Sequence, residues 1–264
     1  MEFADGKILA EAGNEVGRIT FNQPEKRNAM SIAMWDGMAR ALDAFEADAS
    51  VRCVVLQGAG DKAFVSGADI SQFEKTRSDA EAQKEYGRQT AGGRLRLAGF
   101  PKPVIGQIRG FCMGGGLGIA MSCDIRIAAE DSQFGIPAAK LGIAYGFDMV
   151  RHLVQLVGPA NAHMILMTGE RFPAAEALRM GLVNKVVPAE RLADEVAALT
   201  ATLAGNAPLS LYANKRTVQA VLADERDRDM AALQAAMGAC FDSADYAEGR
   251  RAFMEKRKPR FAGR

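Results

Sequence analysis

The sequence contains few of the residues that build metal sites and disulfide frameworks. Its 264 residues include four cysteines and two histidines, and no two cysteines form a C-x-x-C pair. This scarcity gives no indication of zinc or of a disulfide framework, so we expect no metal and reduced thiols. Reduced thiols are typical of the cytoplasm, which is the location we predict. The cysteines are Cys53, Cys112, Cys123 and Cys240.

Long apolar runs and an excess of charge of either sign are also absent. No apolar stretch is long enough to span a bilayer, and acidic residues interrupt the N-terminal segment where a signal peptide would need a basic and then an apolar stretch. The formal net charge of +1 gives no reason to expect nucleic acid or an anionic membrane as a partner. The remaining composition is typical of a globular protein with one large domain, alone or with an appendage.

Glycine, by contrast, is concentrated at one place. Residues 104–108 form a short apolar run typical of a covered strand, residues 114–116 are all glycine, and an apolar helix pattern starts at Leu117. The first amides of a helix lack intrahelical acceptors, and the helix dipole favours negative charge there. A ligand oxygen that gains charge during a reaction would be stabilised at such a turn. Close packing of the strand against the helix is the alternative explanation.

This glycine turn matches neither of two common nucleotide-binding motifs. Counted from Gly114, G-x-G-x-x-G requires glycine at position 119, where the chain has Ile119. No Lys-Ser or Lys-Thr pair follows the glycines, which excludes a P-loop at this turn. We therefore expect neither NAD nor ATP here.

Strand and helix patterns alternate up to about residue 187, which predicts an α/β fold with a mostly parallel sheet. Ser31 is a candidate N-cap of the amphipathic helix predicted over 32–48. Gly158-Pro159 is expected to end the helix that starts at residue 147. The tail after about residue 205 is helical and is expected to pack against the fold or another subunit. We predict a hairpin over 1–22, strands over 51–57, 104–108, 124–129 and 184–187, helices over 32–48, 79–98 and 147–157, a short helix between Pro173 and Gly181, and a loop over 134–142.

Six segments, in their order and spacing, resemble the crotonase (enoyl-CoA hydratase/isomerase) superfamily over nearly the whole chain. The resemblance implies a crotonase-like spiral of ββα turns over residues 1–204, carrying an acyl-CoA site. It implies that residues 205–264 form a C-terminal helical region for self-association as a homotrimer or a dimer of trimers. The six segments are 22–30, 63–70, 110–116, 123–128, 174–184 and 248–257.

The resemblance also implies site residues. Two backbone amides, those of Ala68 and Gly115, would hold the thioester oxygen, and the second falls on the glycine turn. Coenzyme A is expected as part of the substrate, with no separate cofactor. Phe253 and Lys256 match a terminal pair that reaches coenzyme A from a neighbouring subunit, and the alternative explanation of the basic tail is a solvated terminal helix. The predicted coenzyme A contacts are Lys26, Arg27, Ala29, Ala68, Asp69, Ile70, Ser71, Phe253 and Lys256.

Both glutamates of the family's hydratases are missing from this chain. The matching positions are Gly118 and Ala138, and neither side chain accepts a proton, so standard hydration lacks its acid/base pair. Tyr145 and Asp148 lie in a segment that the resemblance places along the acyl pocket, and they are the candidate catalytic side chains. The alternatives are that Tyr145 is a pocket wall or structural donor, and that Asp148 is a carboxylate favoured by a helix N-terminus.

The leading hypothesis is an acyl-CoA enzyme of this family that stabilises a thioester enolate. The L-G-x-x-Y pattern at 141–145 resembles methylmalonyl-CoA decarboxylases of the superfamily, although those carry histidine at the position of Ala68. Decarboxylation needs an enolate sink rather than a strong base. A non-catalytic acyl-CoA-binding protein is the alternative of another class. Apolar residues that are candidates to line the acyl pocket are Phe73, Met113, Ile143 and Phe147.

Overall fold

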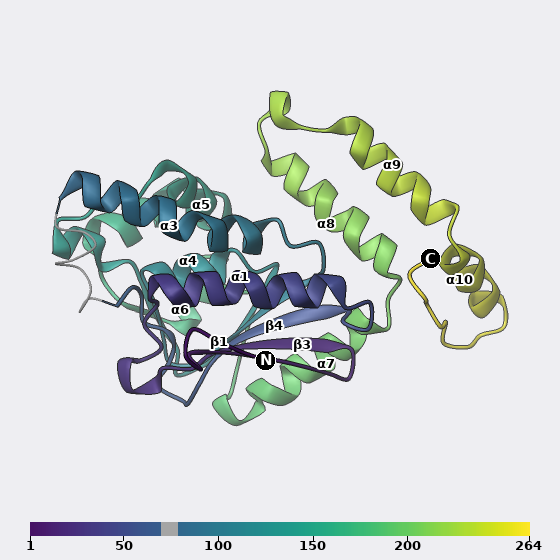
Figure 1. Cartoon of the computed structure of the whole chain (residues 1–264), viewed down its shortest axis with the longest axis horizontal. Helices are drawn as coiled ribbons and strands as arrows, with labels where there is room; N and C mark the ends of the chain where they lie inside the picture. The colour runs from purple at the N-terminus through teal and green to yellow at the C-terminus, as the bar shows by residue number, and fades with distance from the viewer. Residues whose placement is uncertain (70–78) are drawn as a thin grey trace.

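Two sheets and the helices around them form the core of the computed structural model, which describes residues 1–69 and 79–264 (Figure 1). Within these residues the larger sheet has the order β1 (Glu2–Phe3), β2 (Ile8–Gly13), β3 (Val16–Phe21), β4 (Cys53–Gly58), β6 (Val104–Ile108), β8 (Ile125–Ala129) and β11 (Lys185–Val187). The smaller sheet has the order β10 (Phe172–Pro173), β9 (Gln133–Gly135), β7 (Phe111–Met113) and β5 (Ala63–Val65). The helices are α1 (Ile32–Ala47), α3 (Ala80–Ala98), α4 (Gly115–Met121), α5 (Phe147–Thr168), α6 (Ala174–Arg179), α7 (Leu192–Ala204), α8 (Pro208–Leu222), α9 (Met230–Phe241) and α10 (Ala244–Met254).

The chain winds as the predicted spiral. The successive pairs β4/β5, β6/β7 and β8/β9 each place one strand in the larger sheet and the next in the smaller sheet. Each pair is followed by helical structure. Helix α3 follows β4/β5, helix α4 follows β6/β7, and the 3-10 helix η3 (Pro137–Leu141) and α5 follow β8/β9. The pairings along the spiral are parallel, and antiparallel pairing is confined to β1–β2, β2–β3 and β9–β10. The mixed α/β fold with a mostly parallel sheet is therefore confirmed.

The larger sheet is buried on both faces, which explains the continuous apolar run in β4. Val54 and Leu56 belong to the main core together with residues of α1, whereas Cys53 and Val55 belong to a second cluster with residues of α7. Successive side chains of a strand point to opposite faces of the sheet. When both faces are covered, every position is buried and apolar, so the sequence shows no alternation of apolar and polar residues. This packing fixes β4 and β6, which lead into β5 and β7, and the segments of the site follow β5 and β7.

Elements with strong local signals lie where the sequence predicts them. The hairpin of β2 and β3 turns through Asn14 and Glu15, whose φ angles of 51° and 63° match a two-residue turn that twists with its strands. The Ser31 side chain caps α1 by accepting a hydrogen bond from the Met34 amide at 3.3 Å. All four cysteines are free, and burial raises the pKa of the Cys123 thiol to about 12.

One prediction from the sequence is wrong in detail. The expected loop over 134–142 contains the end of β9 and the 3-10 helix η3, which begins at Pro137. The helix from Phe147 is interrupted where the sequence predicts its end, because Gly158 has the non-helical angles φ 74° and ψ 164°. A second helical segment then continues to Thr168. Proline fits the first turn of a helix, so Gly158-Pro159 ends one helical segment and begins the next.

Helices α8 to α10 extend from the core as an arm (Figure 1). Neither α8 nor α9 contains a buried residue. The arm is held to the core by Lys215, whose ammonium nitrogen lies 2.7 Å from the Asp124 carboxylate, and by a hydrogen bond from Gln219 to the carbonyl of Ala98. The division of the chain at residues 204 and 205 stays a prediction. In the two described ranges, no helix has the length and apolar character of a membrane span.

Candidate active site

The glycine turn connects β7 to α4 in a conformation that only glycine adopts readily. Gly114 has φ 53° and ψ −117°, and its amide donates a hydrogen bond to the Gly135 carbonyl at 2.9 Å. A Cβ on Gly116 would lie 2.1 Å from the Val65 carbonyl oxygen, so α4 packs against β5 at backbone distance. Close strand–helix packing therefore explains Gly116, and the positive φ explains Gly114. Neither reason applies to Gly115.

Two backbone segments that are distant in the sequence lie close together at this turn. Met30 pairs with the extended backbone around Ala68, donating to the Gly67 carbonyl at 2.8 Å and accepting from the Asp69 amide at 3.0 Å. Successive N–H groups of an extended chain point to opposite sides, so the Ala68 N–H is directed away from Met30. A Cβ on Gly115 would lie 3.9 Å from the Ala68 nitrogen. Gly115 is also the first residue of α4, where an N–H has no intrahelical acceptor.

The polar loop before α1 is pinned beside these amides by Asn28. Its carboxamide is fully buried, donates to the carbonyls of Ala59 and Ala63 at 3.0 and 2.7 Å, and accepts from the Gln23 amide at 3.0 Å. Next to it, the Lys26 ammonium lies 2.9 Å from the carboxylate of Asp69, which follows Ala68 directly. The two segments predicted to hold coenzyme A are therefore joined to each other. Between them, Ala29 is buried with 7% of its surface exposed.

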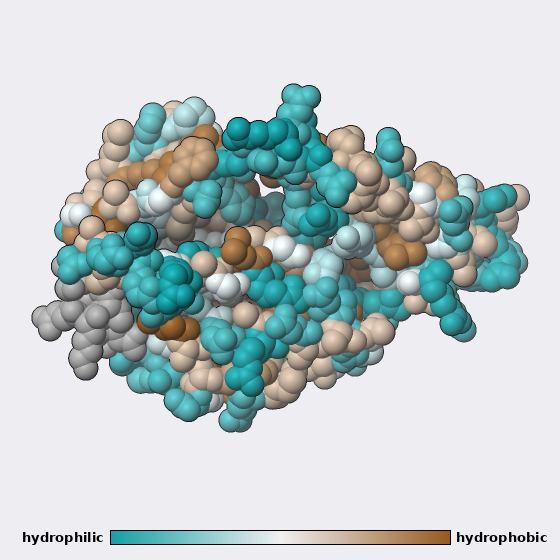
Figure 2. Space-filling view, turned by 45° about the horizontal axis from the view of Figure 1, so that its top comes forward, coloured by the Kyte–Doolittle hydropathy of each residue, from teal (hydrophilic) through white to brown (hydrophobic). Residues whose placement is uncertain are grey.

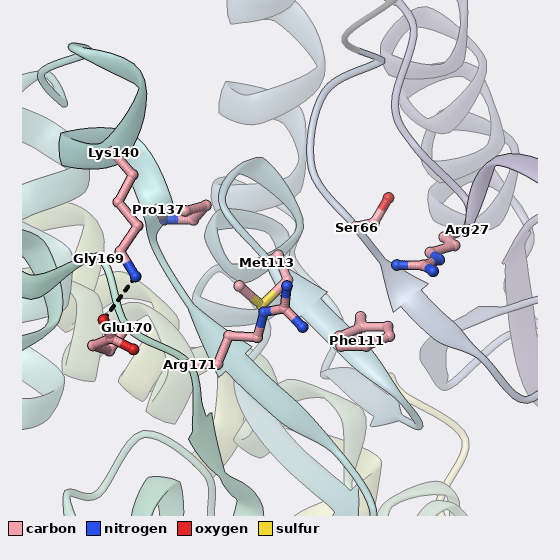
Figure 3. A pocket seen from close by; sticks show the side chains of 9 residues that line it. All are labelled: Arg27, Ser66, Phe111, Met113, Pro137, Lys140, Gly169, Glu170 and Arg171. Atoms are coloured by element: carbon pink, nitrogen blue, oxygen red, sulfur yellow. Dashed lines mark hydrogen bonds and ion pairs between the residues drawn. The ribbon is translucent and has the colours of Figure 1, made fainter.

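A cavity of about 490 Å³ opens beside the glycine turn, within the size range of ligand pockets (Figure 3). Met113 and Ser66, which come just before the two amide-bearing segments, contribute to its wall. The guanidinium carbons of Arg27 and Arg171 lie 5.1 and 5.3 Å from the centre of the Phe111 ring. The full lining is Arg27, Ser66, Phe111, Met113, Pro137, Lys140, Gly169, Glu170 and Arg171.

The charges around this cavity favour an anionic ligand. Arg27, Lys140 and Arg171 supply three cations, and Glu170 is the single acidic side chain in the lining. The Lys140 ammonium lies 2.7 Å from the Glu170 carboxylate, and this pair lowers the pKa of Glu170 (Figure 3). The remaining positive charge is carried by the two arginines that contact the Phe111 ring. Guanidinium groups suit phosphate groups of a ligand, and they also stack on aromatic rings.

The two candidate catalytic side chains differ in their surroundings. The Tyr145 hydroxyl oxygen lies 3.3 Å from the position that a Cβ on Gly114 would take, so it sits directly at the turn. Asp148 is exposed in the first turn of α5, where a carboxylate complements the helix dipole. Ala138 is buried in η3. Of the predicted acyl-pocket residues, Phe147 is 77% exposed, whereas Met113 is buried and lines the cavity.

Several predicted contacts are not part of this cluster. Phe253, 83% exposed, belongs to α10, and Lys256 follows this helix; α10 is part of the arm and lies away from α4 in Figure 1. They do not reach the glycine turn of their own chain. Ile70, Ser71 and Phe73 fall outside the described residues.

The sequence alone did not identify three residues that the fold brings to the cavity. Phe111 belongs to β7, a strand of three residues that has no periodic pattern. Lys140 and Arg171 come from segments that precede and follow α5, and no local signal indicates that they meet. Among residues 1–69 and 79–264, no group of His, Cys, Asp and Glu side chains is arranged to hold a metal ion.

Comparison with known proteins gives one consistent result. Residues 11–264 match the family described as enoyl-CoA hydratase/isomerase. The short-chain-enoyl-CoA hydratase of Clostridium acetobutylicum is 37% identical over 253 residues, covering 95% of each chain. The crotonyl-CoA hydratase of Syntrophomonas wolfei is 37% identical over 254 residues, covering 96% of this chain and 97% of the relative. The crystal structure of an enoyl-CoA hydratase/carnithine racemase from Magnetospirillum magneticum superposes with a TM-score of 0.94 at 35% identity, covering 99% of this chain and 97% of the other.

Proposed function

The chain belongs to the crotonase superfamily, the enoyl-CoA hydratase/isomerase family, and we propose that it is an enzyme that binds an acyl-CoA thioester and stabilises its enolate at the glycine turn. The observation that carries this proposal is the pair of backbone amides, because the Ala68 nitrogen lies 3.9 Å from the position that a Cβ on Gly115 would take. Preorganised N–H donors stabilise an oxygen on which negative charge develops. Coenzyme A would be held by the loop of Lys26 and Arg27, with the cationic cavity beside it.

Hydration is the reaction named for several relatives, but this chain lacks the carboxylates that the resemblance associates with it. Gly118 and Ala138 stand at the two positions. We therefore propose a reaction that forms the enolate without a strong base. In a decarboxylation of a malonyl-type thioester, the bond from the α-carbon to the carboxylate breaks, carbon dioxide leaves, and the electron pair passes to the thioester oxygen. A proton then adds to the α-carbon, and the position of the Tyr145 hydroxyl favours it as the donor.

The test is an assay of crotonyl-CoA hydration, followed as loss of the conjugated thioester absorbance, beside an assay of carbon dioxide release from malonyl-CoA and methylmalonyl-CoA. We expect thioester binding, negligible hydration and measurable decarboxylation. Hydration at about 1–10³ s⁻¹, the usual range for enzymes, would contradict the proposal. Tyr145→Phe and Asp148→Asn then test the side chains, since unchanged turnover in both removes them as candidates. Tight binding without turnover across many thioesters would instead identify a non-catalytic acyl-CoA-binding protein.

Self-association through the arm is a second part of the proposal. Val221 in α8 and Met237 in α9 are 69% and 57% exposed, among many apolar side chains of the arm. Apolar and polar residues are interspersed on the face of the molecule drawn in Figure 2. Because the core covers neither Val221 nor Met237, these side chains belong to the surface that we propose is buried on association. A trimer or a dimer of trimers would also bring Phe253 and Lys256 to the site of a neighbouring chain. The predicted cytoplasmic location remains part of this proposal.

Light scattering during size-exclusion chromatography tests the assembly. We expect a mass of three or six times the 28.2 kDa chain. The double variant Val221→Glu/Met237→Glu is expected to shift the mass towards the monomer, because it places charge on a surface that association would bury. Leu95→Glu, at an equally exposed position in α3 outside the arm, is the control. A wild-type monomer at micromolar concentration would contradict the proposal.

A further inference from the structure

Three glycines, the N-cap residue Gly114 and two residues of α4, lie at helical spacing beside the site. Gly118 follows Gly114 by four residues and Gly115 by three, which is the spacing of neighbours on a helix surface. We call Gly114, Gly115 and Gly118 the glycine face. A side chain at position 118 would therefore project from the same side of the helix as the opening between the two amides.

Two side chains from residues 145–149 cover this face. The Tyr145 hydroxyl lies 3.3 Å from the place of a Cβ on Gly114, and the Met149 terminal methyl lies 2.2 Å from the place of a Cβ on Gly118. The Met149 sulfur is 3.5 Å from the same place. The Met149 thioether thus occupies the space into which a side chain at position 118 would project. A residue larger than glycine fits at position 118 only if Met149 moves.

Met149 is held in this position rather than lying loosely on the surface. It is partly buried and packs against the main hydrophobic core, as do Ile143 and Tyr145. Gly118 is itself only partly buried. The consequence is an apolar wall that begins next to the Gly115 amide.

We propose that Met149 determines acyl-chain specificity: its thioether forms the wall of the acyl site over Gly118 and restricts the substrate to thioesters with short acyl groups. This inference rests on the proposed function, because it places the thioester oxygen at the Gly115 amide. The acyl group would then run along the glycine face, where Tyr145 and Met149 leave little depth. Methionine is unbranched and flexible, so shortening it opens space without moving the backbone.

The first test measures geometry and needs no ligand. Gly118→Ala is expected to stabilise the protein less than Gly92→Ala does, because its Cβ forces the Met149 methyl to move and this cost offsets the gain in helix propensity. In the Met149→Ala background the same Gly118→Ala substitution is expected to give the full gain. Gly92→Ala serves as the control, since a Cβ there has no neighbour within 4 Å. Additive effects of the two substitutions would overturn the contact on which the inference depends.

The second test measures binding of coenzyme A, acetyl-, butyryl-, hexanoyl- and octanoyl-CoA by titration calorimetry. We expect wild-type affinity to fall beyond butyryl-CoA, and Met149→Ala to raise hexanoyl-CoA affinity about tenfold, as burial of two further methylenes predicts, with acetyl-CoA unchanged. Met149→Leu keeps the bulk and should keep the wild-type profile, as should Met167→Ala at a 72% exposed position of α5. If Met149→Ala does not change how affinity depends on acyl-chain length, the inference about Met149 is overturned and the proposed function is not. Failure of every thioester to bind overturns the proposed function as well.

Discussion

Gly115→Ala is expected to weaken binding of a thioester enolate by about 10²- to 10³-fold, because the added methyl keeps the oxygen from the amide and the effect should equal that of losing one oxyanion donor. The added methyl would stand 3.9 Å from the Ala68 nitrogen, an ordinary contact distance, so the backbone has no reason to move. The methyl would nevertheless occupy the opening between the two amides and keep an oxygen from approaching both. The substitution should therefore weaken binding of the charged oxygen without changing the fold of the turn.

Acetoacetyl-CoA provides the measurement, because its enolate has an absorbance band that increases when the enolate is bound. We expect the band with the wild-type protein and its loss with Gly115→Ala, while the affinity for coenzyme A itself changes little. Gly92→Ala in α3 is the matched control, because a methyl there meets no neighbour, and a better helix former should raise stability by up to about 1 kcal/mol. Equal enolate binding by the wild-type protein and Gly115→Ala would remove the amide pair from the mechanism.

The parts of the fold that the sequence predicts are those whose signals are local. The hairpin turn needs two residues with positive φ, and Asn14 lies in it; α1 needs a cap, and Ser31 supplies it. Strands β7 and β9 have three residues each and no usable pattern. These short strands form because each pairs with a neighbouring strand of the smaller sheet; Cys112 of β7, for example, pairs with Phe134 of β9. Such pairing depends on the path of the whole spiral and not on the residues of the strand.

The same distinction applies to the site. Gly115 stands out in the sequence because consecutive glycines before an apolar helix indicate a special turn. The amide of Ala68 has no such signal, and only the family resemblance pointed to it. The contact of Arg171 with the Phe111 ring joins a residue after α5 to a strand before α4, so it follows from the fold alone. The Met149–Gly118 contact was missed for a related reason, since a glycine in a sequence does not show what fills the space beside it.

Asn28→Asp is expected to lower the free energy of unfolding by at least about 3 kcal/mol at neutral pH, because each buried polar group left unpaired costs about 1–3 kcal/mol. The Asn28 side chain is fully buried, and its amide donates to two carbonyls at 3.0 and 2.7 Å. A carboxylate of the same shape keeps the bond from the Gln23 amide but donates to neither carbonyl. It also places a negative charge against two carbonyl oxygens without water, which adds to the cost.

Chemical unfolding of the wild type, Asn28→Asp and Asn22→Asp measures this effect. Asn22 is the matched control because it is only partly buried and donates one hydrogen bond, to the Gly6 carbonyl at 2.9 Å. Burial should raise the pKa of the new carboxyl in the folded protein, so the folded variant binds a proton more readily than the unfolded chain. Stability of Asn28→Asp relative to wild type should therefore improve as the pH falls and worsen as it rises. Equal losses for Asn28→Asp and Asn22→Asp would show that the loop is not pinned at Asn28, and the positions of Lys26 and Arg27 beside the turn would then need another cause.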